Sequence, residues 1–106
     1  MSDKRWDENT DLLEKTRDEV KEPPRYTVVL HNDNFTTQEF VVWVLIKVFQ
    51  LSQEESFKIM MDVHKKGKGS VGKSYTSDIA RTKAKTVEAL AKENEYPLKC
   101  TVEPLG

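Results

Sequence analysis

The stretch LHNDNFTTQEF, residues 30–40, constrains the fold most, because a strand, a polar loop and a helix start follow one another within it. The residues that lead into it, 25–30, are β-branched and aromatic, which predicts a strand. Small polar residues then end that strand. Thr36 with Glu39 three residues later is typical of a capping box, which predicts that a helix begins there. A strand end and a helix N-terminus therefore meet around one polar loop.

The bulk composition predicts one soluble domain. The chain has 106 residues, of which 37% are hydrophobic and 33% are charged, enough for a modest core. No apolar run reaches the roughly 18 residues of a membrane span, and the N-terminus lacks the apolar core of a secretory signal. Cys100 is the only cysteine, so we expect no disulfide framework and a cytoplasmic location. With a net charge of −1, neither a nucleic acid nor a membrane is an expected partner.

The first 24 residues differ from the rest of the chain. Residues 1–24 carry five Lys or Arg and eight Asp or Glu, with few large apolar side chains. Such a segment cannot offset the entropy lost on ordering. Pro23 and Pro24 then prevent a helix from continuing into the domain. The sequence predicts a flexible N-terminal arm over 1–24 and a folded domain over 25–106.

Hydrophobic periodicity predicts three helices and two further strands. The first helix is apolar on nearly all sides, and a small domain cannot bury a whole helix, so we expect one of its faces to be exposed. A capping box of Ser52 and Glu55 starts the second helix, and Gly67 ends it. The order β-α-α-β-α-β predicts an α+β fold with a three-stranded antiparallel sheet packed against helices. The expected ranges are about 37–49, 53–65 and 77–93 for the helices, and 71–75 and 98–102 for the later strands.

The segment GKGSVGKS, residues 67–74, matches the phosphate-binding pattern G-x-x-x-x-G-K-[ST]. A true P-loop would place Lys73 on the phosphates and Ser74 on magnesium, between a buried strand and a helix. Here a helix precedes the segment, and two residues separate it from the next helix. A basic hairpin is the favoured interpretation, and a nucleotide-binding protein stays an alternative.

Catalytic and metal chemistry find little support in the sequence. Two separated histidines and one distant cysteine do not make a metal site. No serine or cysteine has a convincing catalytic partner. We therefore expect no enzyme activity, no metal and no cofactor. His64 stands out, because it ends an apolar face of the second helix.

Three blocks, in this order and spacing, resemble a known family. They are N-D-N-F-T-x-x-E-F-V from Asn32, M-x-x-V-H-x-x-G from Met60 and N-E-Y-P-L-x-C from Asn94. Over about residues 24–104 the chain resembles the ClpS family. These bacterial adaptors carry N-end-rule substrates, or N-degrons, to a Clp AAA+ unfoldase for degradation. A general protein–protein interaction module that uses the face around Trp43 stays a further alternative.

The resemblance implies a peptide-binding site for a free N-terminal residue with a large side chain, typically Phe, Leu, Tyr or Trp. A protonated amine needs acceptors and a negative charge, which suits an Asn, an Asp and a neutral His. The implied residues are Asn32, Asp33 and His64 for the α-amine, Asn34 and Thr36 for the peptide backbone, and Gln38, Val42, Met60, Val63 and Leu98 for the hydrophobic pocket.

The resemblance also implies a partner, and the chain differs from the family's usual residues at two positions. Asp78 and Lys83 align with positions that contact the N-terminal domain of the unfoldase, which is ClpA-like in the family. Asn34 stands where many members have a second Asp, and Gln38 stands where some have a Met at the pocket rim. The exact side-chain preference is therefore left open.

Overall fold

The computed structural model describes residues 22–105. The predicted arm over 1–24 lies almost entirely outside the described residues, so it stays a prediction. Among the described residues, three helices and three strands follow one another in the predicted order, which confirms the α+β class. The elements are β1 (Arg25–His31), α2 (Gln38–Phe49), α3 (Gln53–Lys66), β2 (Lys68–Ser70), α4 (Ser77–Glu93) and β3 (Lys99–Leu105).

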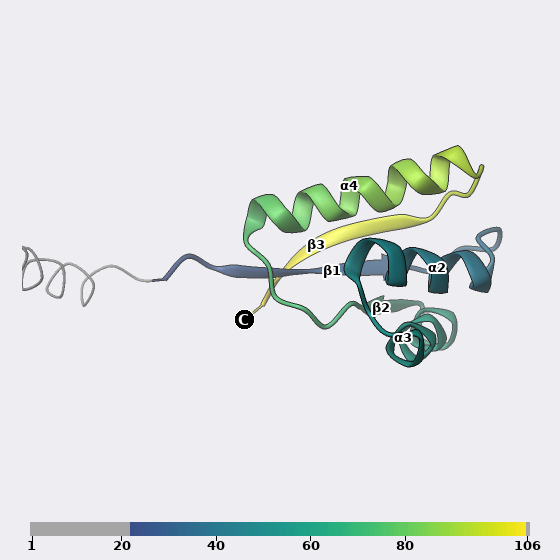
Figure 1. Ribbon diagram of the computed structural model, residues 1–106, viewed down its shortest axis with the longest axis horizontal. Helices are drawn as coiled ribbons and strands as arrows, with labels where there is room; N and C mark the ends of the chain where they lie inside the picture. The colour runs from purple at the N-terminus through teal and green to yellow at the C-terminus, as the bar shows by residue number, and fades with distance from the viewer. Residues whose placement is uncertain (1–21, 106) are drawn as a thin grey trace, which may run out of the picture.

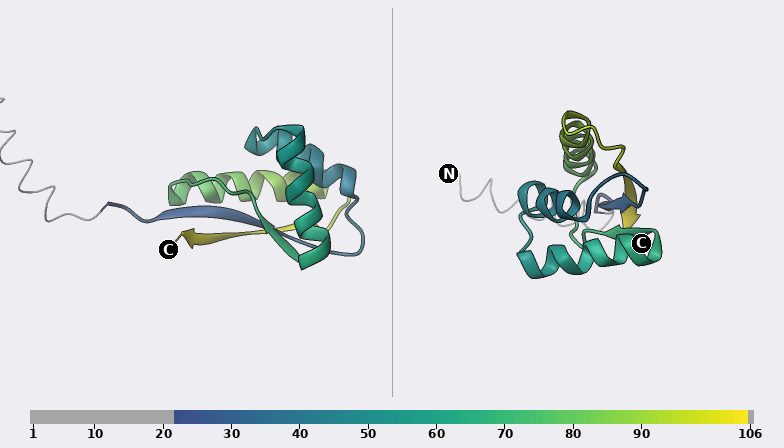
Figure 2. Two further views of the ribbon diagram at one scale, coloured as in Figure 1. Left: turned by 90° about the horizontal axis from the view of Figure 1, so that it is seen from below. Right: turned by 90° about the vertical axis from the view of Figure 1, so that its right-hand side faces the viewer.

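The sheet is antiparallel with β1 at its centre, in the order β2-β1-β3. The helices pack on one face: α4 contacts β1 and β3, α3 contacts β2, and α2 contacts both other helices (Figures 1 and 2). Val28 and Leu30 on β1 are fully buried under this layer. Their neighbours across the sheet are apolar or small, because Leu30 pairs with Cys100 on one side and Gly69 on the other.

Helix α2 is buried on one side and exposed on the other, as its all-round apolar sequence predicts. Val44 and Leu45 are fully buried, whereas Trp43 is 44% exposed and Ile46 is 39% exposed. Lys73, from the loop after β2, and Lys83, from α4, donate to carbonyls at its C-terminal end, which suits the negative end of the helix dipole. No helix among residues 22–105 is long and apolar enough to cross a membrane.

The second strand lies earlier than predicted: β2 is Lys68–Ser70, not 71–75. Gly67 ends α3 with φ +89°, and this left-handed turn sends the chain straight back along β1. Glycine has a low propensity for strands, so local sequence does not favour a strand at Gly69. A Cβ at this position, however, would lie 2.8 Å from the Val63 side chain. Close approach of α3 to the strand therefore requires glycine, and this tertiary requirement overrides local strand propensity.

The predicted ends of α3 and α4 are confirmed. Ser52 and Glu55 form the reciprocal capping box, each side chain accepting from the other's backbone N–H at 3.0 Å. Thr76 caps α4 by accepting from the Ile79 N–H. The local rules for helix ends therefore succeed where nothing else competes for the capping side chain.

Candidate functional site

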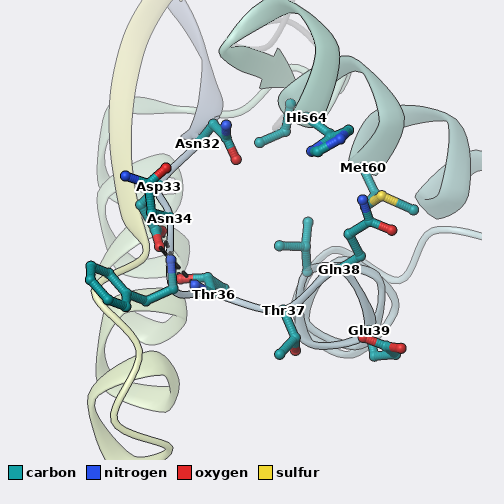
Figure 3. Close-up of a pocket in the computed structure, with 12 residues that line it drawn as sticks. Asn32, Asp33, Asn34, Thr36, Thr37, Gln38, Glu39, Met60 and His64 are labelled. Carbon is teal, nitrogen blue, oxygen red and sulfur yellow. Dashed lines mark hydrogen bonds between the residues drawn. The ribbon is translucent and has the colours of Figure 1, made fainter.

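A pocket of about 520 Å³ opens where the loop after β1 meets the start of α2 and the end of α3 (Figure 3). Its walls combine polar groups from the loop with apolar groups from the two helices. The lining residues are Asn32, Asp33, Asn34, Phe35, Thr36, Thr37, Gln38, Glu39, Val41, Met60, Val63 and His64.

The carboxylate of Asp33 organises the loop. One of its oxygens accepts from the backbone N–H groups of Phe35 and Thr36, both at 2.7 Å. The other accepts from the Thr36 hydroxyl at 2.7 Å. Partial burial raises the pKa of Asp33, but the bonds from Thr36 and Phe35 outweigh it and hold the pKa below its usual value. The loop therefore carries a fixed negative charge at neutral pH.

This arrangement overturns the predicted capping box at Thr36 and Glu39. The Thr36 hydroxyl donates to Asp33, and the residue lies in the loop bend rather than at the helix start. Thr37 caps α2 instead, because its side chain accepts from the Phe40 N–H at 3.1 Å. Helix α2 consequently begins at Gln38.

Helix α3 supplies the facing wall. Met60 and Val63 are 4% and 3% exposed, and His64 in the last turn is exposed. The Asn32 N–H donates to the Gly67 carbonyl at 2.9 Å, which ties the start of the loop to the end of α3. Within residues 22–105, the side chains of Asn32 and His64 form no hydrogen bond with each other or with any neighbour. Their acceptor atoms are therefore available to a ligand.

The structure changes two members of the predicted apolar lining. Val41, not Val42, lines this pocket, and Val42 lines a neighbouring groove. Leu98 does not line the pocket, but it is buried in the core cluster that also contains Val41 and Met60. The signal for Val41 was present in the sequence, since it shares the buried helical stripe with Phe40.

The loop side of the pocket also holds residues that the sequence prediction missed. Phe35, Thr37 and Glu39 line the pocket in addition to the predicted residues. Phe35 is 75% exposed, which is unusual for so large an apolar side chain. All three lie within the polar stretch that the sequence marked, so only their individual roles were missed.

The segment that matches the P-loop pattern has a structural role. The Lys73 ammonium donates to the Phe49 carbonyl at 3.2 Å, at the end of α2. The Ser74 hydroxyl accepts from Arg25 at 2.8 Å. The next helix begins at Ser77, so its N-terminus does not follow the Lys-Ser pair. The strand–loop–helix context of a phosphate site is therefore missing.

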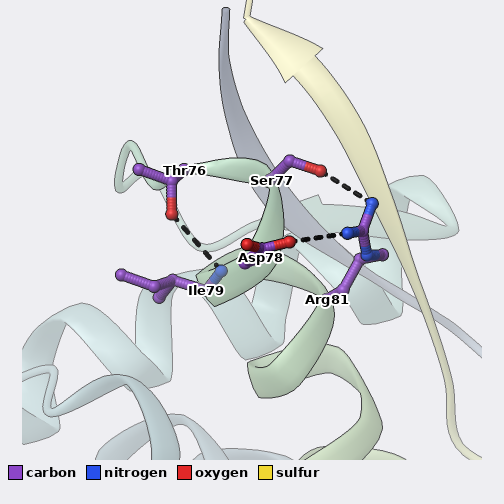
Figure 4. Close-up of polar contacts among 5 residues, drawn as sticks. All are labelled: Thr76, Ser77, Asp78, Ile79 and Arg81. Carbon is purple, nitrogen blue, oxygen red and sulfur yellow. Dashed lines mark hydrogen bonds and ion pairs between the residues drawn. The ribbon is translucent and has the colours of Figure 1, made fainter. Parts of the chain in front are cut away.

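The two residues predicted to contact an unfoldase lie on α4, and neither lines the pocket. Asp78 is in the first turn, where its carboxylate pairs with Arg81 at 2.7 Å and stays highly exposed (Figure 4). Lys83 is half-buried, and its ammonium donates to the Val48 carbonyl at 3.0 Å. Asp78 is thus available to a partner, whereas Lys83 is partly used within the fold.

No group of three or more His, Cys, Asp or Glu among residues 22–105 is placed to hold a metal ion. Cys100, the one cysteine, is buried, and burial together with nearby Glu88 raises its thiol pKa to about 12. The pocket offers hydrogen-bond acceptors, the carboxylates of Asp33 and Glu39, and an apolar wall.

Comparison with known proteins agrees with this arrangement. A family model described as "ATP-dependent Clp protease adaptor protein ClpS" matches residues 21–101. The ClpS adapter protein of Myxococcus xanthus is 51% identical over 88 residues, covering 83% of this chain and 81% of the relative. That of Nitratidesulfovibrio vulgaris is 48% identical over 95 residues, covering 90% and 92%.

A solved structure shows the same fold. Agrobacterium tumefaciens ClpS2 bound to L-phenylalaninamide matches with a TM-score of 0.75 at 42% identity, covering 79% of this chain and 100% of that chain. The family model and the relatives span most of the chain, and the order of strands and helices is the one that the motifs predict. The chain therefore belongs to the ClpS family of adaptor proteins of the ATP-dependent Clp protease.

Proposed function

We propose that this protein binds the free N-terminal residue of N-degron substrates and delivers them to a Clp AAA+ unfoldase, without catalysing a reaction itself. One observation carries the proposal: a single pocket joins acceptors that have no partner within residues 22–105, and a fixed carboxylate, to a buried apolar wall. An N-terminal residue presents the matching chemistry, a charged α-amine beside a side chain. Phenylalaninamide, the ligand of the A. tumefaciens relative, has both groups.

The α-amine would lie between the loop and the end of α3. Asn32 would accept through its side-chain carbonyl and His64 through a ring nitrogen. Asp33 would supply the negative charge, since its carboxylate is already held in place by the loop. Charge-assisted bonds of this kind are stronger than neutral ones, which would make the free amine a requirement for binding.

The side chain of the first residue would occupy the apolar part of the pocket. Met60, Val63 and Val41 form its buried wall, and Gln38 lies at the rim. Burying a Leu or Phe side chain is worth about 1.5–3 kcal/mol, enough to select either over Ala. The flexible thioether of Met60 would adapt the wall to ring or branched shapes. Asn34 and Thr36 would bind the first peptide group.

Delivery would use surfaces away from the pocket. The exposed carboxylate of Asp78 would contact the N-terminal domain of a ClpA-like unfoldase, with Lys83 contributing through the exposed part of its side chain. Residues 1–24 would act as the arm that the unfoldase engages during hand-over. The adaptor would act in the cytoplasm.

Fluorescence polarisation with two labelled peptides tests the amine site. A peptide that begins with Phe should bind, and its N-acetylated twin should not. Replacing His64 by Ala should weaken binding of the free peptide by about tenfold to a hundredfold, the loss expected for a hydrogen bond to a charged group. His31→Ala is the matched control, because His31 contacts Thr101 on the sheet and does not line the pocket. Equal binding of both peptides would exclude amine capture.

A further inference from the structure

A second hollow, of about 420 Å³, runs along the outer side of α2 and α3. Three of its side chains are among the large apolar groups most exposed on the described part of the chain: Trp43 at 44%, Ile46 at 39% and Phe57 at 56%. The residues that line this α2–α3 groove are Gln38, Glu39, Val42, Trp43, Ile46, Phe57 and Met60. An apolar hollow with exposed aromatic walls is typical of a binding surface.

The groove is continuous with the pocket proposed for the N-terminal residue. Gln38, Glu39 and Met60 line both hollows. Gln38 and Met60 approach each other from α2 and α3 in Figure 3, at the boundary between the two. Within residues 22–105 the Gln38 amide forms no hydrogen bond, so no bond holds this boundary closed.

The N-to-C direction of a bound peptide would lead its second residue toward the groove. Asn32 and His64, the proposed acceptors for the amine, lie at the top of the view in Figure 3, and Glu39 lies at the bottom. A chain that starts at the top can leave past the boundary residues. Successive residues of an extended chain are about 3.3–3.6 Å apart and their side chains alternate in direction, so the second side chain would enter the adjoining hollow where the backbone bends at the shared residues.

We propose that the α2–α3 groove is a subsite for an apolar side chain at the second position of the bound peptide. This inference rests on the proposed function, because it needs the first residue to be held in the pocket. Among the described residues, Glu39 is the one charged side chain that lines the groove, and it lies at the shared end. The rest of the groove offers apolar contact, which favours Leu, Met or Phe over Ser at the second position.

Two labelled peptides that differ only at the second residue, Phe-Leu and Phe-Ser, test the subsite by fluorescence polarisation. The Leu peptide should bind the wild type about three- to tenfold more tightly, as expected for a side chain that is partly buried in an open groove. The double variant Ile46→Ala with Phe57→Ala should bind both peptides with the affinity that the wild type shows for the Ser peptide. Both side chains lie outside the first pocket.

Ile79→Ala is the matched control, because Ile79 is 48% exposed on α4 and lines neither hollow. It should leave the preference for Leu unchanged. Equal wild-type affinity for the Leu and Ser peptides would overturn the subsite while leaving first-residue binding intact. A preference for Leu that survives the double variant would also overturn it, since the side chain would then lie elsewhere. Failure of both peptides to bind would instead refute the proposed function itself.

Discussion

Asp33 has two separable roles, and a pair of substitutions tells them apart. Its carboxylate accepts three hydrogen bonds from Phe35 and Thr36, which hold the loop. It is also the one carboxylate that the motif places beside the proposed amine site. Asp33→Asn keeps an acceptor oxygen for the two backbone N–H groups and removes the charge. Asp33→Ala removes the acceptors as well.

The two variants should differ in stability more than in affinity. Asp33→Ala leaves two backbone N–H groups and one hydroxyl without their partner, and should cost about 1.5–3 kcal/mol of unfolding free energy. Asp33→Asn should cost less than about 1 kcal/mol, because the backbone bonds remain. Both should weaken binding of a peptide that begins with Phe by about 1–2 kcal/mol, or roughly five- to thirtyfold. This expected loss is smaller than for a fully buried charge, because solvent screens a carboxylate that is only partly buried.

The pH dependence of stability follows from the lowered pKa of Asp33. The folded protein prefers the ionised carboxylate, so its contribution is fully present above the unfolded pKa of about 3.9. It is lost as the pH falls through the lower folded pKa. Urea unfolding of the wild type and Asp33→Asn, at pH 7 and at several acid pH values, should therefore show two stability curves that converge in acid.

Fluorescence polarisation at low and high salt completes the test. Salt should weaken peptide binding by the wild type more than by Asp33→Asn, because the wild type has one more carboxylate at the pocket to be screened. A fully folded Asp33→Asn protein with wild-type affinity would refute the electrostatic argument. Asp33 would then serve the loop alone, and the amine would depend on Asn32 and His64.

Three further predictions concern the scaffold. Gly69→Ala should lower the unfolding free energy by about 1–3 kcal/mol in urea titrations, because the new Cβ would lie 2.8 Å from the Val63 side chain. Cys100, whose pKa is raised to about 12 by burial and by Glu88, should resist iodoacetamide in the native protein and react in urea, as mass spectrometry would show; rapid native labelling would contradict this. Calorimetry with Mg-ATP should detect no binding, and Lys73→Ala should only destabilise the end of α2; binding that this variant abolishes would restore the nucleotide hypothesis.

The sequence predicts the fold well wherever a local signal acts alone. The capping box of Ser52 and Glu55 and the glycine stop at Gly67 are local, and both are present in the structure. The exposed face of α2 follows from its composition, since an all-round apolar helix cannot be buried in a small domain. Strand β2 was misplaced because its reason is not local. The close packing of α3 on Gly69 depends on tertiary contacts that no strand propensity contains.

The family resemblance predicts the residues of the polar half of the pocket, and those of the apolar half only in part. Asn32, Asp33 and Thr36 are consecutive or nearly so, and any loop at that point brings them together. To predict the apolar wall, one must know the rotation of α2 about its own axis to within one residue. Because a helix turns about 100° per residue, choosing Val42 instead of Val41 selects a different hollow.

The error at the helix start has a physical origin in the loop before it. Two threonines precede α2, and the capping-box pattern favours Thr36 because Glu39 follows it at the right spacing. The pattern ignores Asp33, a charged acceptor three residues earlier, which binds the Thr36 hydroxyl and backbone more strongly than a neutral cap would. Thr37 is left as the cap, and the helix begins one residue later. Assigning the donors of the loop to its carboxylate first, and the helix cap second, gives the observed start of α2 at Gln38.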